Sequence, residues 1–108
     1  MKPFTLFVNK ADLRGERHST LTWGPAQAGV ARGVTNAVAE GAIPAAEVDD
    51  LLLIAAVWVD WAADDTTAVY RNNFEATLEA LRAAREGRPD LADVLASRDA
   101  PSNRFFQP

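Results

Sequence analysis

The stretch Trp23–Pro44, WGPAQAGVARGVTNAVAEGAIP, decides the fold because both ends of a helix are marked in it. Gly24 suits the N-cap position, and Pro25 suits the first helical position, where its fixed φ matches a helix and its missing N–H loses no partner. At the other end Gly41 supplies the left-handed C′ residue, and Pro44 prevents the helix from resuming. We therefore predict a helix of about four turns within this stretch.

One face of this helix is apolar and has unusually small side chains. Its two rows are Ala26, Val30, Val34 and Val38, and Gly29, Gly33, Ala37 and Gly41. The residues of each row recur every four positions, which is the spacing of a buried helix face. Two glycines inside a helix cost roughly 1 kcal/mol each relative to alanine. This cost predicts that another backbone comes very close, belonging either to a sheet or to a neighbouring subunit.

Gln27 is the polar exception on that face. By the helical period it lies between Val34 and Val38 in angle, so we expect its amide to point inward or into a cleft. The N–H groups and positive dipole of a helix N-terminus favour an anionic or carbonyl-bearing ligand at this corner. The alternative is that Gln27 only hydrogen-bonds a nearby strand.

Composition predicts one folded domain over residues 1–108, with a core at about 3–87 and a tail at 88–108. Hydrophobic residues make up 48% of the chain and charged residues 24%, which excludes wholesale disorder. The formal charge of −4 argues against a nucleic-acid partner. The apolar runs are too short for a signal peptide or a membrane span, so we expect no membrane association.

Residue counts restrict the chemistry further. The sequence has no cysteine, which excludes disulfides and thiolate sites and suits the cytoplasm. His18 is the only histidine, so a zinc site of the usual type cannot form within one chain. No EF-hand spacing surrounds the paired aspartates, and we expect no metal.

Two alternating segments precede the helix and predict a β-hairpin. Phe4–Ala11 alternates in the manner of a strand covered on both sides, and Arg17–Trp23 alternates again after a turn at Arg14-Gly15. Lys10 ends one row of the first strand, where it is either simply solvated or offers a cation to a ligand. In this arrangement His18 lies on the polar, exposed row near the turn.

After the helix, Leu51–Trp61 is apolar on both faces and predicts a central strand. Asp60 follows it and is a candidate for proton transfer if burial favours its protonated form, with a cap or an ion pair as the alternative. Asp64 or Asp65 can cap a final helix that runs to Glu86. A helical turn is also predicted within residues 44–50 and a short helix within residues 90–97, and Phe105-Phe106 forms an apolar pair in the tail.

The predicted order is β-β-α-β-α, an α/β (α+β) two-layer domain whose small sheet is covered by helices on one face. A central strand that is apolar on both faces, in a sheet with open edges, predicts contact with another subunit. We therefore expect a homo-oligomer.

Four segments of the chain resemble the formaldehyde-activating enzyme family, whose members condense formaldehyde with tetrahydromethanopterin in one-carbon metabolism. They are TLFVNK at Thr5–Lys10, WGPAQAGVA at Trp23–Ala31, AVAEGAIPAAEVDDL at Ala37–Leu51 and NFEAT at Asn73–Thr77. The resemblance runs from about residue 3 to residue 87 and is far more specific than any single motif.

The resemblance implies a ribosomal protein S5 domain 2-like fold and a ring-shaped homopentamer with the pterin bound between subunits. In the family's pattern the positions of Lys10, Asp12 and Gln27 contact the pterin. A pterin edge needs amide donors and acceptors and its acidic tail needs cations, so an amide and an ammonium group suit this role. The implied cofactor is tetrahydromethanopterin or a related pterin or folate.

The sequence also departs from the family. The family's N-terminal half, with the histidine assigned as general acid, has no counterpart here. Position 12 is usually threonine and is Asp12, and the histidine usual late in the central strand is replaced by Asp60. His18 and Asp60 are the candidate proton donors in its place.

Three hypotheses follow. The first is an enzyme that promotes capture of formaldehyde on a pterin-type cofactor. The second is a non-catalytic module that binds the pterin or senses formaldehyde and has lost the general acid. The third is a structural partner of a full-length family member or of its own copies.

Overall fold

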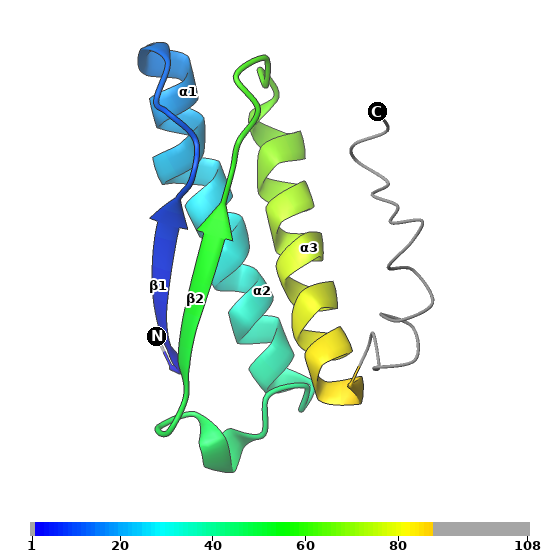
Figure 1. The fold of residues 1–108 in the computed structure, drawn as a ribbon. Helices are drawn as coiled ribbons and strands as arrows, with labels where there is room; N and C mark the ends of the chain where they lie inside the picture. The colour runs from blue at the N-terminus through cyan, green and yellow to red at the C-terminus, as the bar shows by residue number, and fades with distance from the viewer. Residues whose placement is uncertain (1, 88–108) are drawn as a thin grey trace, which may run out of the picture.

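The structure is a computed structural model and describes residues 2–87; the short helix predicted within residues 90–97 and the Phe105-Phe106 pair lie outside them. In chain order the elements are β1 (Phe4–Asn9), α1 (Gly15–Leu21), the π-helical turn η1 (Thr22–Ala26), α2 (Gln27–Ala39), the 3₁₀ turn η2 (Ala45–Glu47), β2 (Leu52–Val57) and α3 (Thr66–Glu86) (Figure 1). The helices cover one face of a small sheet, which confirms the predicted α/β two-layer class.

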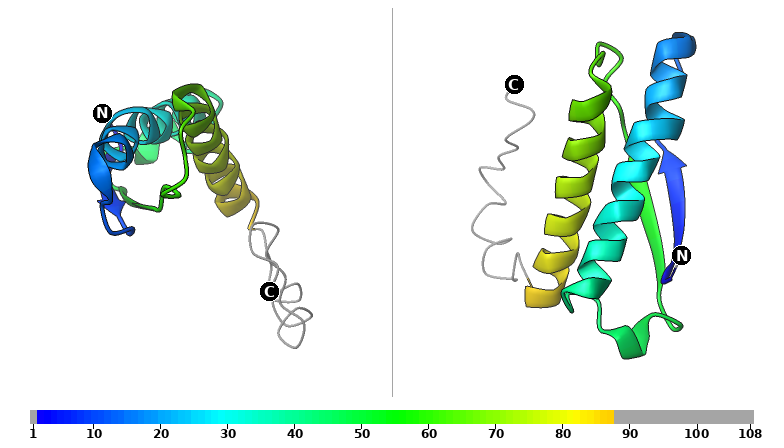
Figure 2. Two further views of the ribbon diagram at one scale, coloured as in Figure 1. Left: turned by 90° about the horizontal axis from the view of Figure 1, so that it is seen from above. Right: turned by 180° about the vertical axis from the view of Figure 1, so that it is seen from behind.

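The sheet consists of β1 and β2 in parallel, with Phe4 opposite Leu52 and Asn9 opposite Val57. The connection between them runs through α1, η1 and α2. With the helices behind the sheet in Figure 1, both strands point upward and β2 lies to the right of β1, and Figure 2 shows the same from behind. The crossover is therefore left-handed, whereas almost all such connections are right-handed.

The predicted hairpin is wrong, because Arg17–Trp23 is helical and not a strand. Gly15, with a φ of 81°, turns the chain into α1, and one helical rod then runs through η1 into α2. Pro25 lies inside this rod and does not begin it. A proline inside an α-helix removes a donor and clashes with the preceding turn, and the wider π-helical turn accommodates it.

The C-terminal ends of α2 and α3 are predicted more accurately than the start of the long helix. Gly41 has a φ of 85° just after α2, as expected for the left-handed residue of a C-cap. The predicted turn within residues 44–50 is η2. Asp65 caps α3 by accepting a hydrogen bond from the Ala68 N–H at 3.0 Å, and Gly87 closes it with a φ of 71°.

Two clusters form the core, one towards each end of the helical layer. The first contains Leu21, Ala26, Val59 and Val69, and the second Val34, Ala37, Ile43 and Leu78. Both join the long rod to α3 or to the segments that flank β2. The inward row of each strand packs on these clusters, through side chains such as Phe7 and Leu53.

Helices α2 and α3 touch at the glycines of α2. A Cβ on Gly33 would lie 2.7 Å from the Thr77 Cβ and 3.0 Å from the Phe74 backbone oxygen, and a Cβ on Gly29 would overlap the backbone oxygen of Tyr70. The expectation of a close backbone is thus confirmed. The neighbour is the chain's own last helix, and not the sheet or subunit that we expected.

A bidentate pair ties the end of α2 to α3 on the surface. Arg82 donates from Nε and a terminal nitrogen to the Glu40 carboxylate at 2.5 and 2.7 Å. These hydrogen bonds lower the pKa of Glu40, so the contribution of the pair to stability is present at neutral pH and is lost as the pH falls through that lowered pKa. In residues 2–87, no helix has the length and apolar character needed to cross a membrane.

The glycine contact gives a first prediction. Gly29→Ala should lower the free energy of unfolding by about 1–3 kcal/mol, because the overlap with Tyr70 outweighs the gain in helix propensity. Gly24→Ala is the matched control, since its Cβ would meet nothing within 4 Å. Urea unfolding followed by circular dichroism measures both; equal stability of the two variants would contradict the close contact.

Candidate functional site

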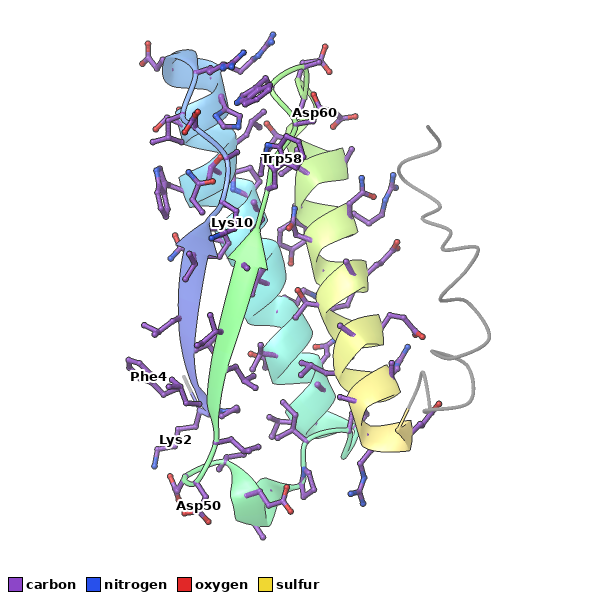
Figure 3. The ribbon with its side chains drawn as sticks, in the orientation of Figure 1. Lys2, Phe4, Lys10, Asp50, Trp58 and Asp60 are labelled. Atoms are coloured by element: carbon purple, nitrogen blue, oxygen red, sulfur yellow. The ribbon has the colours of Figure 1, made fainter. Side chains whose placement is uncertain are left out.

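Three of the polar residues predicted for the site, Lys10, Asp12 and Asp60, lie at the end of the sheet where both strands finish. Lys10 follows β1, and Asp60 lies three residues beyond β2. Figure 3 shows Lys10, Trp58 and Asp60 at this end, far from Lys2 and Asp50 at the other. Ligands of α/β sheets commonly bind outside the carboxyl ends of parallel strands, so this is the end to consider first.

Asn9 shapes the chain as it leaves β1. Its side-chain amide donates to the Ala11 carbonyl at 2.8 Å and its oxygen accepts from the Ala11 N–H at 3.0 Å. This turn leaves Lys10 and Asp12 exposed on either side of the buried Ala11. Neither the Lys10 ammonium nor the Asp12 carboxylate has a hydrogen bond or ion pair within residues 2–87, so both are free to meet a ligand.

His18 is buried, with 2% of its surface exposed, and does not lie on the exposed row of a hairpin as predicted. Its Nδ1 accepts from the Arg14 N–H at 3.2 Å, and its Nε2 lies 2.7 Å from the Val59 carbonyl oxygen. A neutral ring with the proton on Nε2 satisfies both partners. His18 therefore joins α1 to the segment after β2, and in this arrangement neither nitrogen is open to a substrate. Its role as proton donor stays a prediction.

Asp60 is exposed, so the burial on which its predicted role depended is not found. One carboxylate oxygen accepts from the Ala62 N–H at 2.7 Å, and its backbone carbonyl accepts from the Ala63 N–H at 3.1 Å. Asp60 thus closes the turn after Val59, which matches the alternative of a cap. The second carboxylate oxygen remains available at the same end of the sheet as Lys10.

An aromatic cluster at this end was not predicted. The Arg14 guanidinium lies 3.7 Å from the Trp61 ring centroid, and the rings of Trp58 and Trp61 meet edge to face at 5.8 Å. The Trp61 indole N–H donates to the Asp12 carbonyl at 2.7 Å, which ties the loop after β1 to the loop after β2. The sequence signal that could have predicted this cluster is the pair of tryptophans, Trp58 and Trp61, three residues apart at the end of an apolar segment.

Gln27 is exposed, and the predicted inward amide is wrong for the single chain. At this level of the rod Ala26 takes the buried position, fully covered in the first core cluster. The predicted helix N-terminus is also absent, because the Gln27 N–H donates to the Gly24 carbonyl within the continuous rod. The Gln27 amide itself makes no hydrogen bond within residues 2–87.

Trp23 lies one turn before Gln27 and therefore on the same side of the rod. Its half-exposed ring packs edge-on against Phe7 of β1 at 5.7 Å between centroids. The unbonded amide of Gln27 thus lies one helical turn after the Trp23 indole, which contacts β1. A flat heterocycle at this place would meet an aromatic ring and an amide.

A well-defined groove of the described residues lies elsewhere. It is a groove of about 380 Å³ between β2 and the inner sides of α2 and α3. None of Lys10, Asp12, His18, Gln27 and Asp60 lines it. In residues 2–87, no group of three or more His, Asp or Glu side chains is placed to hold a metal ion.

The sequence matches the family model described as formaldehyde-activating enzyme (Fae) over residues 1–106. The chain is 41% identical over 104 residues to the 5,6,7,8-tetrahydromethanopterin hydro-lyase of Methanosarcina barkeri, which covers 96% of this chain and 58% of that protein. It is 42% identical over 98 residues to the bifunctional enzyme Fae/Hps of Methanococcoides burtonii, covering 91% of this chain and 25% of that protein. The chain thus spans little more than half of the first relative.

The position of His18 gives the second prediction. His18→Ala should lower the free energy of unfolding by about 2–4 kcal/mol, because it opens a cavity and leaves the Arg14 N–H and the Val59 carbonyl without partners. Asp60→Asn, which keeps an oxygen for the Ala62 N–H, should change it by less than about 0.5 kcal/mol. Urea denaturation compares them, and a His18→Ala protein as stable as the parent would refute the structural role.

Proposed function

Since the chain belongs to the formaldehyde-activating enzyme family, we propose that it promotes the condensation of formaldehyde with a tetrahydromethanopterin-type cofactor to give the methylene adduct. The similarity to a tetrahydromethanopterin hydro-lyase supports this choice of substrate. The observation that carries the proposal is that Lys10, Asp12 and Gln27, the positions selected by the family resemblance, all have exposed side chains. None of the three makes a side-chain hydrogen bond or ion pair within residues 2–87.

The proposed reaction has two steps. A pterin amine adds to the formaldehyde carbon to form a hydroxymethyl adduct, and the second amine then displaces its hydroxyl as water. The departing oxygen needs a proton, which a general acid supplies, and the second amine releases one, so the protons balance. In this proposal Gln27 and Trp23 hold the pterin plane, and Lys10 binds a carbonyl or acidic group of the cofactor.

Asp60 is our proposal for the proton donor. Its carboxyl group is exposed at the Lys10 end of the sheet and has one oxygen that no described residue occupies. His18, by contrast, uses both ring nitrogens for backbone partners. The lost family histidine late in the central strand also corresponds to position 60, which favours this position over position 18.

We further propose that copies of the chain assemble through the outer face of the sheet and complete the site between them. Phe4, Leu6, Ile54 and Trp58 are 63%, 44%, 65% and 65% exposed on this uncovered face. Leu6 lies opposite Ile54 in the parallel register, so these side chains form a continuous apolar surface. A second copy would remove it from water, and the ring of five implied by the family is one such assembly.

One observation favours a non-catalytic alternative. The only histidine of the chain is buried and engaged, so the described residues offer no imidazole for acid catalysis. A protein that binds the pterin or senses formaldehyde through Lys10 and Gln27 would need none. Pterin binding without turnover would select this function.

The third prediction concerns the binding residues. Gln27→Ala should weaken binding of tetrahydromethanopterin roughly 5- to 30-fold, as expected for one lost hydrogen-bonding side chain. Asn72→Ala removes an exposed amide from α3 and is the matched control. Calorimetry gives the affinities, and formation of the methylene adduct above the spontaneous rate gives turnover. Equal affinities for both variants would contradict the assigned role, and a background rate with intact binding would select the sensing module.

The fourth prediction concerns assembly. Leu6→Lys should weaken self-association at least about tenfold, because it buries an ammonium group in an apolar interface. Asn72→Lys adds the same charge to α3 and should leave association unchanged. Sedimentation velocity measures both; a monomeric parent protein at all concentrations would refute the proposed assembly.

A further inference from the structure

The helical layer is wider than the sheet beneath it. Packed helices lie about 8–10 Å apart and neighbouring strands about 4.8 Å apart, so two helices side by side cover about four strands. Here the rod and α3 cover a sheet of two strands within the described residues. In Figures 1 and 2, α3 stands beyond β2 on the side away from β1. There is therefore room for about two further strands beneath α3.

The edge of β2 beside this place carries unpaired backbone groups. The Val57 carbonyl points to β1, where it accepts from the Lys10 N–H at 2.8 Å. Because successive residues of a strand direct their backbone groups to opposite edges, Ile54 and Ala56 direct theirs away from β1. No described residue pairs with that edge, since β2 has β1 as its only neighbour in residues 2–87.

The groove of about 380 Å³ adjoins this edge and is almost free of charge. Its walls are β2, Val30 and Val34 of the rod, and Ala76, Thr77 and Ala80 of α3. Ala76 and Ala80 are exposed, although charged residues such as Glu75 and Arg71 occupy the neighbouring exposed positions of the same helix. The small apolar side chains of α3 leave space next to the edge of β2. Large side chains of a third strand would fill that space.

We propose that an extended segment of a second polypeptide adds to the free edge of β2 as a third strand beneath α3. Its backbone pairs with Ile54 and Ala56, and large apolar side chains at alternate positions fill the space between β2 and the alanines of α3. This proposal concerns the sheet, goes beyond the proposed function, and holds whether or not the chain turns over formaldehyde.

A second copy fits this place poorly. If two copies paired through their β2 edges with all helices on one face, each α3 would need the position that the other α3 occupies, because each overhangs its own edge. The partner strand must therefore come without a helix above it. The given sequence matches 58% of the hydro-lyase of Methanosarcina barkeri, and the part of that protein outside the match provides a defined probe.

The test mixes the full chain with that unmatched part of the Methanosarcina barkeri protein, produced as a separate polypeptide. Calorimetry measures binding, and amide hydrogen exchange measures protection residue by residue. We expect saturable binding and at least tenfold slower exchange of the Ile54 and Ala56 amides. No binding, or binding without protection of these two amides, overturns the proposal.

Paired variants localise the contact. Ala80→Arg places a charged side chain in the groove and should weaken binding at least tenfold, whereas Asn72→Arg adds the same charge to α3 outside the groove and should change it less than twofold. Equal effects of the two variants overturn the proposal. Neither formaldehyde nor pterin is present, so a catalytically inactive protein can still pass this test.

Discussion

The approach of α2 to α3 at Gly29 and Gly33 is the constraint on which the rest of the structure depends. Without side chains at these two positions the helices meet at their backbones, and α3 is held beside α2, where it extends past the free edge of β2. The second core cluster fills the space below this contact, with Val34 and Leu78 on either side. The overhang of α3 and the groove between α3 and β2 follow from that arrangement.

Much of the helical layer could be predicted from single residues that start or end a helix. Gly41 and Gly87 adopt the left-handed conformation that ends a helix, and Asp65 caps α3 through its own side chain. The small residues of α2 correctly indicated a close backbone. They could not indicate which backbone, because the partner lies about forty residues away and its own sequence carries no matching mark.

The hairpin was wrong because its segment satisfies two patterns. Residues 17–23 alternate, yet His18, Leu21, Thr22 and Ala26 are also spaced as one face of a helix, and these are the residues that are buried. The bond between His18 and the carbonyl of Val59 crosses 41 positions and helps to fix the helical choice. Such long-range contacts lie outside the reach of local periodicity.

The candidate site residues came from the family resemblance, and their geometry could not be predicted from the sequence pattern. The family resemblance selected Lys10, Asp12 and Gln27, and the structure leaves all three exposed with unbonded side chains, whereas helical angle alone placed Gln27 inside. In the assembly that we propose, a neighbouring copy completes the binding surface, so that one copy contains only part of it. Pattern and burial within one chain give no information about such a surface.

Trp58 and Trp61 sit at the end of the sheet where the candidate site lies, with Arg14 stacked on one of the two rings. The third tryptophan, Trp23, contacts β1 on the same side of the rod as Gln27. All the indole chromophores of the chain are therefore close to the surface where a cofactor would arrive. The protein contains its own fluorescent reporters, and ligand occupancy can be followed by a change in emission without any attached dye.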